Sequence, residues 1–342
     1  MSANTTLKQV ATRAGVAWST ASYAINGGPK PVSDETRERV LQAARELGYS
    51  SNLLARGLVT GRGTMIGVLV PEMHSHLTSY QLSGVEEAAQ QLGYIIMLSV
   101  YRSEIDSALL AQRNMAARRM EGIVCLFDTA GSLNGRLDGI LTGLAEMDLP
   151  FVSTCHDPIA GVETDCFLVD HEQGGYLATC HLLEMGRRAI AFAGPPHLNA
   201  GRDRLAGYHR AHDEFGLRPH EELIMAPSAC IAHLGEEVGE ELFSRSLRPD
   251  AVFAASDNLA AGMLRSLRRR GMSVPDDVAL VGFDDNPPLC DALDPPLTSV
   301  HCPLEEIGRA SVHRLIERLN DPQNWCPQIR TLPCTLTGRQ SA

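Results

Sequence analysis

The chain has 342 residues and a formal net charge of −11, and this length suggests two or three domains. No apolar run approaches the roughly 20 residues of a membrane span, and the N-terminus lacks the basic, apolar and small-residue series of a signal peptide. These features exclude a membrane protein and lead us to expect a cytoplasmic one. Nine cysteines without C-x-x-C pairs favour reduced thiols over a disulfide framework or a zinc site.

The charge is divided unevenly along the chain. Residues 1–62 hold eight Lys and Arg against four Asp and Glu, a net charge of +4, which leaves −15 for residues 63–342. A basic N-terminal segment on an acidic body is typical of a nucleic-acid-binding module joined to a part that does not touch nucleic acid.

Residues 6–26 predict two short helices joined by a tight turn. Thr6 stands where an N-cap belongs, and Gln9 completes a capping box. Gly15 ends the first helix, and a second begins at about Trp18 with Ala21 on its inner face. This layout is typical of a helix-turn-helix whose second helix lies in the DNA major groove. An ordinary helical hairpin in a core that binds nothing is the alternative.

A third helix and a short amphipathic segment follow. Ser33 is expected to cap the third helix and Gly48 to end it, so residues 1–50 predict a compact all-α headpiece. Residues 52–58 could form a seven-residue helix, which is marginal alone in water and would fold only against a partner. Residues 51–63 are therefore interpreted as a hinge helix and linker.

From residue 64 onward, buried-strand patterns alternate with helical patterns. Strands are predicted at 65–71, 94–100, 122–127, 151–155, 167–170, 189–194, 222–226, 251–256 and 278–283. The run PPLTSV (295–300) follows, and a further strand is predicted at the end of the chain. Helices are predicted at 78–92, 105–119, 133–146, 172–185, 202–216, 234–245, 258–270 and 304–319. The alternation indicates parallel sheets wrapped by helices, in two lobes with a cleft between them. We assign about 64–164 and 302–321 to the N-lobe, and about 165–301 and 322–342 to the C-lobe.

Two clusters in the body have the residue types of a catalytic or metal site. Cys155, His156 and Asp157 are adjacent on a predicted strand, so their side chains alternate between its faces and cannot converge on one substrate atom. His74 and His76 have no third ligand at a supporting spacing, which favours a loop at the mouth of the cleft. We therefore expect neither catalysis nor a bound metal there.

Two further clusters contain acidic residues. His209 and His212, with Asp213, share a helical face, for which a solvated surface is favoured over a metal site. Asp284 and Asp285 follow a predicted strand and could simply cap the next turn. Ligand binding is the stronger interpretation, because α/β proteins bind ligands at the carboxyl ends of parallel strands.

Several strings together resemble the lac repressor (LacI/GalR) family of bacterial transcription regulators over essentially the whole chain. They are TLKQVATRAGV (6–16), TASYAIN (20–26), VSDETRERVLQAARELGY (32–49), NLLARGL (52–58), IGVLVP (66–71), HLLEMGRRAIAFAG (181–194), RLAGY (204–208), SDNLAAG (256–262), VPDDVALVGFDD (274–285) and PPLTSV (295–300). The resemblance implies a small helix-turn-helix headpiece, a hinge helix and a two-lobed α/β body like that of periplasmic sugar-binding proteins. It also implies a homodimer on a near-palindromic double-stranded DNA operator, a small-molecule effector and no cofactor.

The resemblance assigns DNA contacts to the headpiece and hinge. In this chain they are Thr6, Trp18, Ser19, Thr20, Ser22, Tyr23, Asn26, Asn52, Ala55 and Leu58. Trp18, Ser19 and Tyr23 stand at the base-reading positions, and Leu58 matches a leucine that the family pushes between base steps. Tyr23 replaces a common Arg and Ala17 replaces a common Ser, so we expect an altered operator more than lost binding.

The resemblance also places an effector between the lobes. The positions implied are His74, Arg204, Cys230, Ser256 and Asp284. An Arg opposite a carboxylate suits a polar ligand with several hydroxyls or a charged edge. A structural ion pair is the alternative role for Arg204. Cys230 stands near a position where sugar-binding relatives often have an aromatic residue, and the loop that holds His74 also departs from the family pattern, so ligand identity stays open.

The predicted function is therefore a sequence-specific, ligand-responsive transcription regulator in the cytoplasm, associated with the nucleoid, and a repressor is favoured. The alternatives are a cytosolic solute-binding or sensor protein without operator function and, less favoured, an enzyme. The residues do not decide the effector, its role as inducer or corepressor, the operator sequence, or dimer against tetramer.

Overall fold

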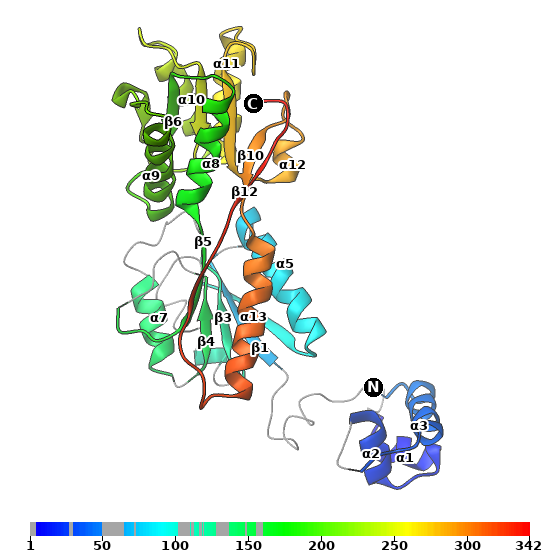
Figure 1. The fold of residues 1–342 in the computed structure, drawn as a ribbon. Helices are drawn as coiled ribbons and strands as arrows, with labels where there is room; N and C mark the ends of the chain where they lie inside the picture. Colours follow the sequence, from blue (N-terminus) through cyan, green and yellow to red (C-terminus); the bar gives the residue numbers. More distant parts are fainter. Residues whose placement is uncertain are drawn as a thin grey trace. The chain divides into compact units, whose positions relative to one another are not determined.

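The computed structural model describes residues 5–26, 30–49, 65–71, 73–101, 110, 113–115, 118, 120–127, 137–147, 149–154 and 160–342 (Figure 1). The chain divides into two compact units, Met1–Thr64 and Met65–Ala342. Within the described residues, no helix is both long and apolar enough to cross a membrane.

The first unit is built from three helices, α1 (Leu7–Ala14), α2 (Trp18–Asn26) and α3 (Asp34–Glu46). The capping box is confirmed, because the Gln9 amide donates to Thr6 Oγ1 at 3.4 Å and the Thr6 amide donates to Gln9 Oε1 at 2.7 Å. Gly15 ends α1 at a φ of 66°, and Ser33 caps α3 as predicted. A small apolar core joins the helices, namely Val10, Ala11, Ala21, Ala24, Val40, Ala43 and Ala44.

The second unit contains two six-stranded sheets. The first has the order β11-β5-β4-β3-β1-β2, and the second has the order β12-β10-β9-β8-β6-β7. The first comprises β1 (Met65–Val70), β2 (Ile95–Val100), β3 (Ile123–Cys125), β4 (Phe151–Ser153), β5 (Asp165–Val169) and β11 (Ile329–Leu332). The second comprises β6 (Ile190–Ala193), β7 (Ile224–Met225), β8 (Ala251–Ala254), β9 (Ala279–Asp284), β10 (Thr298–His301) and β12 (Thr335–Thr337). Neighbouring strands are parallel except β10 and β12, so the predicted parallel α/β body is confirmed.

Helices pack on both sheets in close pairs. The first lobe has α5 (His76–Gln91), α7 (Leu137–Ala145) and α13 (Leu304–Asn320). The second has α8 (His171–Glu184), α9 (Asn199–Glu214), α10 (Ala232–Leu242), α11 (Asp257–Arg269) and the short α12 (Pro287–Cys290). A glycine permits the approach of α5 to α13, because a Cβ on Gly84 would lie 2.0 Å from the Glu305 carbonyl oxygen. Likewise, a Cβ on Gly207 of α9 would lie 2.0 Å from the Glu172 carbonyl oxygen of α8.

The chain passes between the two sheets three times (Figure 1). The first crossover is at Asp170, between β5 and α8; the second is at residues 302–303, between β10 and α13; the third is at residues 333–334, between β11 and β12. The predicted lobe ranges differ from this sheet membership, because 165–169 and 329–332 lie in the first sheet. A short apolar run reads the same in either sheet, so its pattern could not assign it.

Three predicted elements differ in detail. Residues 221–223 form a 3₁₀ turn and only 224–225 form strand β7, where a five-residue strand is predicted. The run at 295–300 contributes strand β10 from Thr298 onward, after two prolines that cannot donate to a ladder. The predicted terminal strand is two strands, β11 and β12, in different sheets. Most of the helix predicted at 105–119, and all of residues 155–157, lie outside the described residues.

Candidate functional sites

Helix α2 turns polar and aromatic side chains away from the headpiece core. Ala21 and Ala24 are buried, whereas Trp18 is 57% exposed and Ser19 is exposed beside it. Burial in the core, the alternative for an aromatic residue here, is therefore not the role of Trp18. Three other predicted contact residues, Thr20, Ser22 and Tyr23, are half-buried. Thr6, before α1, is exposed. Asn26 is the last residue of α2, and Asn52, Ala55 and Leu58 lie outside the described residues.

In the body, Arg204 of α9 lies at the centre of a buried polar cluster. Its side chain is only 5% exposed, and Nη2 lies 3.4 Å from Asp284 Oδ1. The guanidinium also donates to the Ala255 carbonyl oxygen, at the end of β8, and Nε lies 3.4 Å from Nδ1 of His171. Its Cζ stacks 3.7 Å from the ring centroid of Phe283. Arg204 therefore ties the start of α8 to the carboxyl ends of β8 and β9.

Two further polar residues, Ser256 and Asp257, lie at the N-terminus of α11 near this cluster. The Leu259 amide donates to Ser256 Oγ at 3.2 Å, so Ser256 serves as the N-cap. Asp257, which is 1% exposed, accepts from the Ser299 hydroxyl at 2.5 Å and from the Asn286 amide at 2.8 Å. Burial and the nearby Asp284 carboxylate raise the pKa of Asp257 to about 7. Two close carboxylates near one Arg resist carrying two negative charges together.

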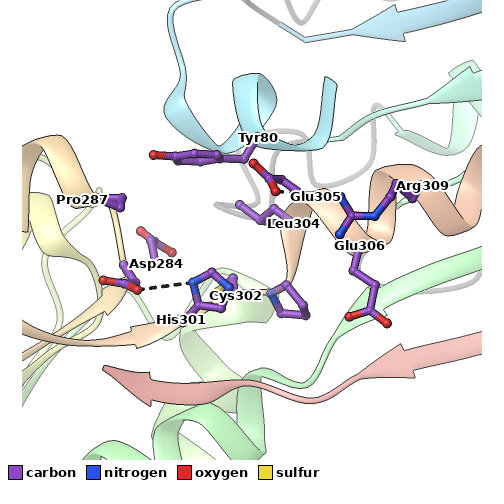
Figure 2. Close-up of a pocket in the computed structure, with 11 residues that line it drawn as sticks. Tyr80, Asp284, Pro287, His301, Cys302, Leu304, Glu305, Glu306 and Arg309 are labelled. Carbon is purple, nitrogen blue, oxygen red and sulfur yellow. Dashed lines mark ion pairs between the residues drawn. The ribbon is translucent and has the colours of Figure 1, made fainter. Parts of the chain in front are cut away.

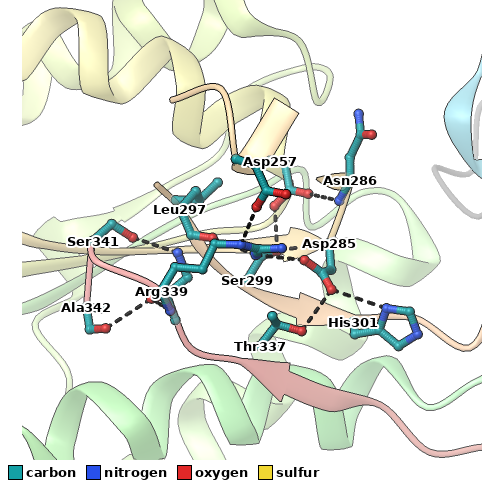
Figure 3. Close-up of polar contacts among 12 residues, drawn as sticks. Asp257, Asp285, Asn286, Leu297, Ser299, His301, Thr337, Arg339, Ser341 and Ala342 are labelled. Atoms are coloured by element: carbon teal, nitrogen blue, oxygen red, sulfur yellow. Dashed lines mark hydrogen bonds and ion pairs between the residues drawn. The ribbon is translucent and has the colours of Figure 1, made fainter. Parts of the chain in front are cut away.

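Asp284 and Asp285 have left-handed backbone angles, with φ of 103° and 52°. Such angles are rare for residues other than glycine, and the two carboxylates have different partners. Asp284 faces Arg204, whereas Asp285 binds Arg339 Nη1 at 2.8 Å, the Thr337 hydroxyl at 2.8 Å and His301 Nδ1 at 3.3 Å (Figure 3). These partners lie on β10 and in the C-terminal segment and not in the next turn, so the cap interpretation does not describe Asp285. Ligand binding by Asp284 stays a prediction.

A pocket of about 330 Å³ lies between the lobes (Figure 2). Its lining residues come from α5, the end of β9, the start of α12, the end of β10, the β10–α13 crossover and α13. They are Tyr80, Asp284, Asp285, Pro287, His301, Cys302, Pro303, Leu304, Glu305, Glu306 and Arg309. Because Asp284 belongs both to this lining and to the Arg204 cluster, the buried ion pair borders the pocket. The lining holds four carboxylates against one Arg and one His.

Comparison with known proteins gives the chain its family. Residues 6–52 match the family described as bacterial regulatory proteins, lacI family, and residues 179–342 match a periplasmic binding protein-like domain. The transcriptional repressor PurR of Vibrio campbellii is 31% identical over 330 residues, which are 93% of each chain. The transcriptional regulator CelR of Thermobifida fusca is 36% identical over 322 residues, 92% of each. The chain belongs to the lacI family.

Solved structures agree with this assignment. A lac repressor dimer bound to operator and the anti-inducer ONPF has a TM-score of 0.79 at 26% identity, over 99% of each chain. A complex of the regulator CelR with cellobiose has a TM-score of 0.69 at 32% identity, over 99% of this chain and 100% of the other. The predicted family, the headpiece with a two-lobed body, and ligand-modulated DNA-binding regulation are thereby confirmed.

The structure brings together only part of the predicted effector set. Arg204 and Asp284 are in contact, and Ser256 follows the carbonyl that Arg204 binds. His74 is exposed in the loop before α5, and Cys230 is half-buried before α10 against the core of the second lobe. Of the predicted set only Asp284 lines the described pocket, and His74, Arg204, Cys230 and Ser256 do not. Their assignment to the effector stays a prediction.

Four residues of the sites were not predicted. His171 lies two residues after the last residue of β5, so the strand-end argument used for Asp284 could have found it. Asp257 stands beside Ser256 in the SDN string, but its contact with Ser299 depends on the pairing of β9 with β10. Tyr80 and His301 meet at the pocket only through the packing of the two lobes, which leaves no local signal.

One prediction was wrong. His212 is not on a solvated surface but is buried, with Nδ1 2.9 Å from the Tyr208 carbonyl oxygen and its ring 4.3 Å from the Tyr208 ring. Burial lowers the pKa of His212, which keeps the ring neutral in the core. The neutral imidazole of His212 is buried although the next residue, Asp213, is exposed, so the two residues do not share one environment. Within the described residues, no group of three side chains could hold a metal ion.

Proposed function

We propose that the chain is a homodimeric repressor, acting in the cytoplasm on nucleoid DNA, whose operator affinity is switched by a small polar ligand beside Arg204 and Asp284. One observation carries the proposal: this buried ion pair lies at the carboxyl ends of β8 and β9 and borders the pocket between the lobes. Relatives support it, since CelR was solved with cellobiose and a lacI-family regulator of Enterococcus faecium, 27% identical, with ribose. The lac repressor dimer on its operator supports the dimer.

The charges of the site narrow the ligand class. Arg204 offers a planar set of donors, and Asp284 accepts, which together suit vicinal hydroxyl groups. Of the four carboxylates that line the pocket, Asp284 and Asp285 are paired with Arg204 and Arg339. Glu305 and Glu306 remain against Arg309 and His301, which gives a phosphate or carboxylate ligand little net attraction. A neutral polyhydroxylated ligand, such as a mono- or disaccharide, therefore fits best.

For the headpiece, we propose that residues 1–50 dock α2 in the major groove and that residues 51–63 form the hinge. Exposed Trp18 and Ser19 with Tyr23 would meet base edges, whereas the polar Thr6, Thr20, Ser22 and Asn26 would contact the backbone. Asn52 and Ala55 would support the hinge, and Leu58 would enter between central base steps. An apolar wedge of this kind kinks the duplex.

The ligand site can be tested by calorimetry on the full chain against mono- and disaccharides, sugar phosphates and purines. Arg204→Ala should weaken binding of the ligand found by about 10- to 100-fold, since a hydrogen bond to a charged group is worth about 1.5–3 kcal/mol. Arg202→Ala is the matched control, because Arg202 lies two residues away on α9 with its side chain 56% exposed. Unchanged binding by a folded Arg204→Ala protein would show that this arginine holds no ligand.

The DNA site can be tested by gel shift with DNA from upstream of the gene, over a range of salt concentrations. Trp18→Ala and Leu58→Ala should each weaken specific binding while leaving ligand affinity intact. Leu41→Ala is the control for Trp18, because Leu41 is also a large exposed apolar residue, 41% exposed, but lies on α3. A wild-type protein with no salt-sensitive, sequence-selective binding would contradict the operator function.

A further inference from the structure

Two cysteines lie opposite each other where the lobes are joined. Cys302 follows β10 on the way to α13, and Cys334 precedes β12 after the chain has left β11. Strands β10 and β12 pair antiparallel, with His301 opposite Thr335 as the last pair of the ladder. The next pair in this register is Cys302 and Cys334. Each cysteine therefore belongs to a different crossover between the lobes.

The pairing gives the geometry that a disulfide needs. Residues directly opposite in an antiparallel ladder point to the same face, with Cα atoms about 4.5–5.5 Å apart. Disulfides span Cα separations of about 4.4–6.8 Å. The Cys334 amide donates to Gln173 Oε1 at 2.8 Å instead of across the ladder. This makes the cysteines a pair without mutual backbone hydrogen bonds, the kind in which side chains are closest.

The first crossover, at Asp170, meets the same point. The Cys334 thiol donates to the Asp170 carbonyl oxygen at 3.4 Å, and the Asp170 amide donates to the Leu332 carbonyl oxygen at 3.0 Å. Both cysteines are buried, at 4% and 2% exposure, but Cys302 also borders the pocket between the lobes (Figure 2). A small oxidant in that pocket would meet Cys302 first.

We propose that Cys302 and Cys334 are a modification site, at which a peroxide forms a reversible disulfide that links two of the three crossovers. The Cys302 thiolate attacks one peroxide oxygen, the O–O bond breaks, and a sulfenic acid and one water result. Cys334 then attacks the sulfenic sulfur, the S–O bond breaks, and a second water leaves. The two thiols lose two electrons and two protons, and hydrogen peroxide becomes two waters.

The surroundings explain why the pair rests as thiols and why the bond would matter. Hydrogen bonding to Cys334 and burial raise the pKa of Cys302 well above its usual value, so only a small fraction of this cysteine is thiolate. In the ladders that the structure describes, no other two cysteines stand opposite each other. Linking the crossovers should stiffen the connection about which the lobes reorient. Its effect on operator binding rests on the proposed function, whereas the disulfide itself does not.

The test is peptide mapping of the full chain after treatment with hydrogen peroxide, without reduction. Tryptic peptide 331–339, which holds Cys334, should appear joined to peptide 271–309, which holds Cys302, and dithiothreitol should separate them. Because peptide 271–309 also holds Cys290, Cys290→Ala is the control that should leave the link intact, and Cys302→Ala should abolish it. Peptides that stay separate in the wild type, or a link that needs Cys290, would overturn the proposal.

Hydrogen exchange tests the mechanical consequence on the same samples. Oxidation should slow exchange severalfold in the amides around all three crossovers, near Asp170, Cys302 and Cys334. The Cys302→Ala protein, treated identically, should show no such change. Equal exchange before and after a proven disulfide would refute the stiffening of the crossovers.

Discussion

Replacement of Asp257 by Asn tests the electrostatics of the effector cluster. The folded protein raises the pKa of this carboxyl from 3.8 to about 7, chiefly by burial and then by Asp284. A carboxyl whose pKa is raised on folding stabilises the fold most at low pH, where it is protonated in both states. That stability is lost as pH rises from about 4 to about 7, at about 1.4 kcal/mol per pH unit and about 4 kcal/mol in all.

Asn can keep both hydrogen bonds of Asp257. Its carbonyl oxygen can accept from the Asn286 amide, and its NH₂ group can donate to the Ser299 oxygen, because a hydroxyl rotates. The free energy of unfolding of the Asp257→Asn protein should therefore be close to that of the wild type at low pH. As pH rises, the variant should become more stable than the wild type. Urea unfolding from pH 4 to 8 measures the difference. A Trp18→Phe background restricts the fluorescence to Trp325, in the body.

Ser299→Ala provides the second arm of this experiment. The Ser299 hydroxyl donates to Asp257 and so favours the charged form; its removal should extend the loss of stability to a higher pH. The raised pKa would be refuted if the difference in unfolding free energy between the wild type and the Asp257→Asn protein stayed constant with pH. A difference that came to favour the wild type at high pH would refute it as well.

Three further predictions concern packing, capping and a surface ion pair. Gly84→Ala should cost about 1–3 kcal/mol in urea unfolding, because its Cβ would lie 2.0 Å from the Glu305 carbonyl oxygen. Thr6→Ala should cost the headpiece about 1 kcal/mol in thermal melts followed by circular dichroism. A hydrogen bond to Asp285 raises the pKa of His301, so the advantage of the wild type over His301→Gln should be full below about pH 6.5 and vanish as pH rises through the folded pKa. With a side chain 50% exposed, that advantage should stay under about 1 kcal/mol in urea unfolding.

The headpiece could be predicted almost completely because its signals are local. The capping box of Thr6 and Gln9, the left-handed turn at Gly15 and the cap at Ser33 each depend on residues within four positions. The alternation of strands and helices in the body was equally accessible. Sheet membership was not, because β5 and β11 differ from strands of the other lobe only in the partners they pair with.

The site was predictable in part, for a related reason. Arg204 and Asp284 belong to recognisable strings, and the carboxyl ends of parallel strands predict where such residues meet. The pocket itself is formed by α5 and α13, which are more than two hundred residues apart in sequence, and by the β10–α13 crossover. Contacts such as Tyr80 near His301 arise only when both lobes are in place.

The contacts of Arg204 suggest how ligand binding and lobe geometry are linked. In this structure the guanidinium already has three protein partners: His171 beside the first crossover, the Ala255 carbonyl and Asp284. A ligand that binds Arg204 must share or replace these partners, and His171 begins α8 directly after the chain leaves β5. A ligand shifts the equilibrium between two arrangements of the lobes only by its difference in affinity for them. Such a difference can arise where a ligand replaces His171 as a partner of Arg204, because His171 lies next to the first crossover. The ion pair that looks structural is therefore also suited to a switch.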